Sequence, residues 1–183
     1  MKSTKFNNYQ FGKQDESISM AFGLEKHLID IRKKNLQKVM SSFEGSHHKL
    51  EYVKTIKNVD FIDDAAAENI NAVWYALSSM YKPTLWIMNL ADIDVLTDSF
   101  LDILDQKVSK IVIQGVYNSE VLDFFTGLNK EVFFAMNIDD AVRTALYACD
   151  GGEVILYSPG VSAQGTQSIC ERGENFKYAI AQL

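Results

Sequence analysis

Cysteine is scarce in this sequence, and the two cysteines form no recognisable motif. Cys149 and Cys170 make no C-x-x-C pair, and no histidine stands near either of them in the sequence. A disulfide framework or a zinc site built on cysteines is therefore not expected, and we predict no metal ligands. The first ten residues also lack the apolar stretch of a secretion signal, so we expect a cytoplasmic location.

Long apolar runs and an excess of positive charge are missing as well. The run TLWIMNL at 84–90 is among the longest, and it has the length of a strand, far from the roughly 20 residues of a membrane helix. Acidic residues outnumber basic ones by 24 to 18, which gives a net charge of −6. This balance argues against membranes and nucleic acids as partners and favours a protein or a small-molecule ligand.

Motifs for phosphate binding and nucleophilic catalysis are absent too. Neither G-x-G-x-x-G nor G-x-x-x-x-G-K-[ST] occurs, so the sequence has no recognisable loop for an ATP γ-phosphate. No G-x-S-x-G elbow occurs, and Ser158 precedes a proline without a base nearby in the sequence. We predict no catalytic residue and no cofactor for the chain alone. His47 and His48 are adjacent, and we expect both to be solvated loop residues.

The sequence does contain the alternating pattern of an α/β protein. Apolar residues recur at helical spacing in 17–29 and 32–43, which predicts a helical segment within residues 1–46. The β-rich runs at 50–56 and 59–63 flank Lys57-Asn58, which predicts a hairpin with a two-residue turn. Further strands are predicted at 85–88, 111–113, 132–134 and 154–157, and helices at 69–81, 97–106, 118–127, 138–149 and 171–182.

This order predicts a mostly parallel sheet of about six strands, one of them in an N-terminal hairpin, with helices on both faces. We expect Trp74, Tyr75 and Trp86 to lie in the core. Ligands bind such sheets beyond the carboxyl ends of the strands. The first loop at that edge lies within FIDDAAAEN at 61–69, where Asp63-Asp64 is a candidate site, with helix capping as the alternative.

Several stretches resemble the carboxyl-terminal domain of the Mur ligases, most closely the branch that adds D-glutamate. The stretches are SSFEGSHHKLEYV, VDFIDDAAAENINAVWYAL, VILYSPGVSAQ and CERGENFKYAI. The family patterns are F-x-G-x-x-H-R-x-E-x-V, I-N-D-S-K-A-T-N, L-S-P-A-C-A-S and E-x-R-G-x-x-F. The resemblance implies a Rossmann-like α/β domain over 47–183. Residues 1–46 then resemble the end of the family's central ATPase domain.

The family's activity implies an ATP-dependent acid–amino-acid ligase, but this sequence departs from the family at the amino-acid site. The family's Ser, Lys and Thr of N-D-S-K-A-T-N are replaced, as are a Lys after the next strand and the last Ser of S-P-A-C-A-S. The residues at these positions are Ala65, Ala66, Glu68, Ile93 and Ala163. Each charge-assisted hydrogen bond that is lost removes roughly 1.5–3 kcal/mol, so we predict a degenerate site that no longer holds an acidic amino acid.

Other positions keep the family pattern. By resemblance, Lys49 (in place of Arg), Asp64 and Asn69 lie on the nucleotide side of the cleft, and Ser158 and Ser162 lie in the last strand-end loop. We expect Arg172 and Phe176, four residues apart on one helix, to dock that helix.

Three functions remain open from the sequence. The first is a non-catalytic Mur-ligase-like module that binds a protein or small ligand, linked to bacterial peptidoglycan precursor synthesis. The second is one part of a ligase that another chain completes, which alone would call for ATP and magnesium. The third is a nucleotide-binding sensor. Residues 1–46 are expected to contact a protein partner or to form a homodimer.

Overall fold

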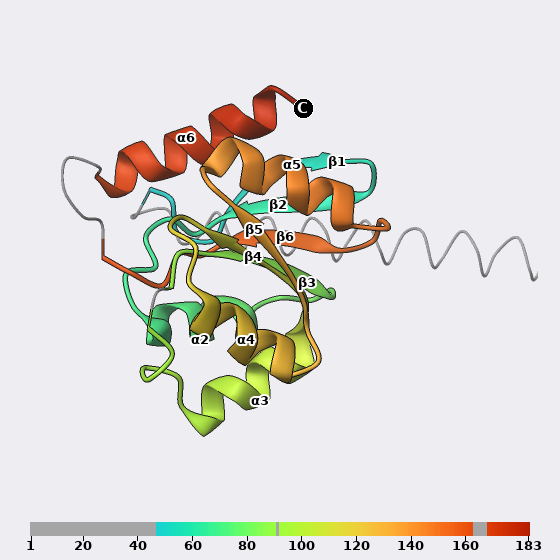
Figure 1. Ribbon diagram of the computed structural model, residues 1–183. Helices are drawn as coiled ribbons and strands as arrows, with labels where there is room; N and C mark the ends of the chain where they lie inside the picture. The colour runs from blue at the N-terminus through green and yellow to red at the C-terminus, as the bar shows by residue number, and fades with distance from the viewer. Residues whose placement is uncertain (1–46, 91, 163–167) are drawn as a thin grey trace, which may run out of the picture. The chain divides into compact units, whose positions relative to one another are not determined.

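The computed structural model describes residues 47–90, 92–162 and 168–183 (Figure 1). The predicted helical segment within 1–46, the partner contacts expected of it and Ala163 lie outside these residues. The described part contains a six-stranded sheet in the order β1-β2-β6-β3-β4-β5. Its strands are β1 Glu51–Ile56, β2 Val59–Asp63, β3 Thr84–Met88, β4 Val108–Gln114, β5 Glu131–Ala135 and β6 Val154–Tyr157. Only β1 is antiparallel to its neighbour, which confirms the mostly parallel sheet.

Five described helices cover the two faces of the sheet, as predicted. They are α2 Ile70–Ser78, α3 Asp98–Lys107, α4 Ser119–Gly127, α5 Ile138–Ala148 and α6 Ile169–Ala181. Figure 1 shows α5 and α6 on one face and α2, α3 and α4 on the other. The N-cap residue of each helix has a side-chain oxygen that accepts a backbone N–H of the first turn. No helix of the described residues is both long and apolar enough to span a bilayer.

The hairpin of β1 and β2 has the two-residue turn that the sequence predicts. Lys57 and Asn58 adopt φ angles of 49° and 62°. Two consecutive left-handed residues match the twist of the paired strands, so the turn closes without splaying them. The hairpin thereby presents Asp63, the last residue of β2, at the carboxyl edge of the sheet.

The core has two layers, one on each face of the sheet. Leu85 and Ile87 pack with residues of α5 and α6, whereas Trp86 faces the other layer and contacts Phe100 and Phe125. Side chains alternate along a strand, so Trp86 faces the opposite layer from its neighbours in β3. It is fully buried, as predicted.

The prediction for two other aromatic residues was wrong. Trp74 and Tyr75 are 40% and 44% exposed. Helix α2 covers the sheet with Val73, Ala76 and Leu77, and this face turns the two aromatic side chains outward.

Candidate functional site

The loop after β2 is tied to its surroundings by backbone hydrogen bonds along its length. The N–H of Asp64 donates to the carbonyl of Tyr157 over 2.8 Å, and the N–H of Ala66 donates to that of His48 over 3.0 Å. At the far end, Gly160 donates to the carbonyl of Ala67 over 3.0 Å. Backbone hydrogen bonds at Asp64, Ala66 and Ala67 therefore tie the main chain of residues 63–69 to the segments around it.

Asp64 is buried at this edge and both of its oxygens have partners. One accepts the N–H of Leu50 over 3.2 Å and the other accepts the hydroxyl of Ser158 over 2.7 Å. Burial raises the pKa of Asp64 to about 7, against the lowering effect of the Ser158 and Leu50 hydrogen bonds. Asp64 does not cap a helix, because the cap of α2 is Asn69.

Asp63 is fully buried and pairs with His48. The Nδ1 of His48 donates to Oδ2 of Asp63 over 2.6 Å, while Oδ1 accepts the N–H of Ala65 over 3.0 Å. Burial raises the pKa of Asp63, and these two hydrogen bonds offset only part of that effect. Gly173 of α6 makes this arrangement possible, since a Cβ at that position would overlap the imidazole ring.

The prediction that His48 is solvated was therefore wrong. Its side chain is 1% exposed, while the neighbouring His47 is exposed. The local sequence suggests a loop, and a loop histidine is ordinarily solvated. The sequence feature that could have indicated this burial is Gly173 in the C-E-R-G stretch, because a glycine inside a helix often marks the close approach of another group.

Arg172 of α6 is buried beside the loop, and its guanidinium is held by backbone carbonyls. Its guanidinium donates to the carbonyls of Ala65 over 2.6 Å and Val161 over 2.8 Å. Phe176, one turn later, stacks on Tyr157 with ring centroids 5.0 Å apart. Both residues are buried, which confirms that they dock α6.

The other predicted site residues occupy the carboxyl edge in different ways. Ala65 is fully buried, and Ala66 and Glu68 are partly buried. Asn69 is exposed, and its oxygen caps α2 by accepting the N–H of Ala72 over 3.1 Å. Three further predicted site residues lie in separate segments. Lys49 is exposed before β1, Ile93 is partly exposed after β3, and Ser162 is exposed after β6.

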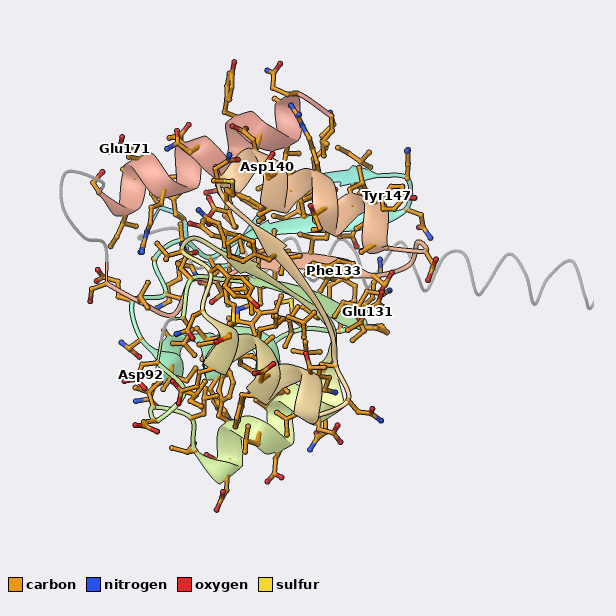
Figure 2. All side chains as sticks on the ribbon, viewed as in Figure 1. Asp92, Glu131, Phe133, Asp140, Tyr147 and Glu171 are labelled. Atoms are coloured by element: carbon orange, nitrogen blue, oxygen red, sulfur yellow. The ribbon has the colours of Figure 1, made fainter. Side chains whose placement is uncertain are left out.

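The carboxyl edge is acidic. Five loops leave it after β2, β3, β4, β5 and β6, and none of their residues is a lysine or arginine (63–69, 89–97, 115–118, 136–137 and 158–168). The same loops carry Asp63, Asp64, Glu68, Asp92 and Asp94. Figure 2 places Asp92 on this side of the molecule together with Glu171 at the start of α6, opposite Glu131 and Tyr147. These loops offer an anionic ligand no basic side chain of their own, and the nearby cations of the described residues include Lys49 before β1 and the buried Arg172 of α6.

Comparisons with known proteins agree with this architecture. A protein of Christiangramia forsetii named UDP-N-acetylmuramoylalanine--D-glutamate ligase is 33% identical over 173 residues, which are 94% of this chain and 39% of the relative. A protein of the same name from Bacteroides fragilis is 33% identical over 90% of this chain and 38% of its own length. The chain thus spans about two fifths of these relatives. No protein-family model matches it.

Solved structures show the same fold. UDP-N-acetylmuramate-alanine ligase MurC from Thermotoga maritima matches 77% of this chain with a TM-score of 0.51 at 17% identity, over 31% of its own length. A bifunctional folylpolyglutamate synthase/dihydrofolate synthase from Yersinia pestis matches 77% of the chain with a TM-score of 0.50 at 14% identity, over 32% of its length. The sequence relatives and the shared fold together show that the chain belongs to the Mur ligase family, in which it corresponds to the carboxyl-terminal part.

Proposed function

We propose that this chain is a non-catalytic module of the Mur ligase carboxyl-terminal type, which binds a protein or small ligand in peptidoglycan precursor synthesis. The observation that carries the proposal is the absence of lysine and arginine from all five strand-end loops. Backbone hydrogen bonds hold residues 63–69 in place, so the proposal assigns the difference from a working amino-acid site to the side chains. A cytoplasmic location is part of the proposal.

The electrostatics explain why an acidic amino acid is a poor ligand for this edge. D-glutamate carries two carboxylates, and each needs cations or N–H and O–H donors once it leaves water. At Ala65 and Ala66 the side chains offer none, and at Glu68 a carboxylate adds repulsion. Losing two or three charge-assisted hydrogen bonds costs on the order of 5 kcal/mol, or over a thousandfold in affinity.

Returning positive charge to the edge tests this explanation. Ala66→Lys combined with Ile93→Lys restores a cation at two of the changed positions, and Ala66→Gln with Ile93→Gln is the control of similar size without charge. We expect the lysine pair to bind D-glutamate at least tenfold more tightly than the glutamine pair in a calorimetric titration. Equal affinities would show that these positions do not form the amino-acid site.

A second candidate function is one half of a ligase that another chain completes. It is favoured by Asp64 and Asn69, which keep the family pattern on the nucleotide side, and by Lys49, which stands there in place of the family's arginine. Phosphate release distinguishes the two functions. The chain is mixed with ATP, magnesium, a UDP-muramoyl substrate and D-glutamate, with and without extract of its own cell. Release that requires both chain and extract, and that Asp64→Asn abolishes, supports the ligase half. If no mixture releases phosphate, the ligase half is excluded and the non-catalytic module remains as the proposed function.

A further inference from the structure

A cluster of metal-ligand side chains lies between α6 and the β1–β2 hairpin, beside the candidate site. One nitrogen of His48 and one oxygen each of Glu51 and Asp63 lie within 4.8 Å of one another. A fourth group, the Oε1 of Glu174 on α6, lies 3.7 Å from Nε2 of His48. The prediction of no metal rested on the missing cysteine motif and on solvated histidines, and the burial of His48 removes the second premise.

The imidazole of His48 is held as it is in many metal sites. Its Nδ1 donates to the carboxylate of Asp63, which leaves a lone pair on Nε2. That Nε2 is buried and has no hydrogen-bond partner in the structure. A buried nitrogen without a partner is unfavourable in a folded protein unless a ligand or ion completes it. The family pattern I-N-D-S-K-A-T-N has Asn at the position of Asp63, so this carboxylate is a departure of the present chain.

The charges of the cluster also call for a cation. Two carboxylates, those of Glu51 and Glu174, flank a single ammonium, and a third, that of Asp63, contacts the other side of the His48 ring. Lys177 supplies the ammonium, with Nζ 2.9 Å from Glu51 and 3.6 Å from Glu174. The lysine has a long flexible side chain that can turn to solvent, and Glu174 is 67% exposed, so an ion has a route to the cluster.

We propose that Nε2 of His48 and the carboxylates of Glu51 and Glu174 form a site for a divalent transition metal ion of the zinc class, which displaces the ammonium of Lys177. Asp63 orients the imidazole through Nδ1. An imidazole nitrogen with carboxylate oxygens is a ligand set that zinc accepts, whereas magnesium and calcium prefer oxygen ligands alone. The ion clamps α6 onto the hairpin and fixes the segment that leads into residues 63–69.

Zinc titration of the full chain against a chromophoric chelator tests the proposal. Cys149→Ser and Cys170→Ser form the background, because both thiols are free and could bind zinc themselves. We expect one zinc ion per chain. Lys177→Met removes the competing ammonium and should tighten binding at least threefold. Asp63→Asn, which keeps the shape of the side chain, should weaken binding at least tenfold.

Two surface variants on α6 separate the site from general surface charge. Glu174→Gln should weaken zinc binding at least threefold, while Glu171→Gln, the same change one turn earlier on an exposed residue, should leave it unchanged. A cobalt complex of the same background should show bands of nitrogen and oxygen ligands. No stoichiometric binding, or equal affinities for Glu174→Gln, Glu171→Gln and Lys177→Met, would overturn the proposal and leave Lys177 as the only cation of the cluster.

Discussion

His48 and Gly173 depend on each other although they are far apart in the sequence. His48 adopts a left-handed backbone, with φ at 63°, and its ring packs on the helix at Gly173, which has no side chain. Glycine inside a helix costs about 1 kcal/mol relative to alanine. Here that cost is offset by a buried imidazole that reaches Asp63.

Gly173→Ala should destabilise the protein by about 2 kcal/mol or more, because the new Cβ overlaps the ring of His48. Gly127→Ala in α4 is the control, since a Cβ there meets nothing within 4 Å. We expect the control to be neutral or slightly stabilising in urea denaturation. If both variants lose the same stability, the account of the contact is wrong.

Asp64→Asn should remove a pH dependence of stability. The carboxyl of Asp64 has a pKa of about 7 in the folded protein and 3.8 as its ordinary value. The folded state therefore holds a proton that the unfolded state lacks, and this group lowers stability as the pH rises from about 4 to 7, by roughly 1.4 kcal/mol per pH unit at most.

The asparagine variant should thus match the wild type near pH 4 and exceed it in stability at pH 8. Asp102→Asn, an exposed residue of α3, is the control that should show no such trend. Chemical denaturation at several pH values measures both. A stability difference for Asp64→Asn that does not change with pH would contradict the raised pKa.

Among the elements, the hairpin offers the clearest test. Lys57 has a φ of 49°, a conformation that costs an L-residue roughly 1 kcal/mol and glycine almost nothing. Lys57→Gly should therefore stabilise the protein by about 0.5–1 kcal/mol. Lys54→Gly, on the exposed part of β1, should destabilise it, because glycine is unfavourable within a strand. Thermal denaturation of the two variants should show shifts of opposite sign, and shifts of the same sign would contradict this.

The elements themselves were predictable because each has a local cause. Hydrophobic period and capping residues indicate helices such as α4 and α5, and a two-residue turn indicates the hairpin. Burial within an element was harder to predict. Trp74 and Tyr75 are exposed because the neighbouring face of α2 suffices to cover the sheet, and this depends on how the helix is rotated.

For the whole molecule, the resemblance correctly indicated the family. The degenerate amino-acid site stays a prediction, which rests on the positions that differ from the family pattern. The changes at Ala65, Ala66 and Glu68 are visible in one stretch of sequence. The pair of His48 and Asp63 was not predictable, because it joins the start of the domain to the end of β2 and requires a glycine in the last helix. Contacts of this kind follow from tertiary packing.

Our central proposal is that the carboxyl edge of the sheet does not bind an acidic amino acid, because the loops after β2, β3, β4, β5 and β6 contain no lysine or arginine. Calorimetric titration of the wild-type chain with D-glutamate, with ATP and magnesium present and absent, tests this most directly. The account predicts no saturable heat up to millimolar D-glutamate in either condition. A dissociation constant in the micromolar range would contradict it.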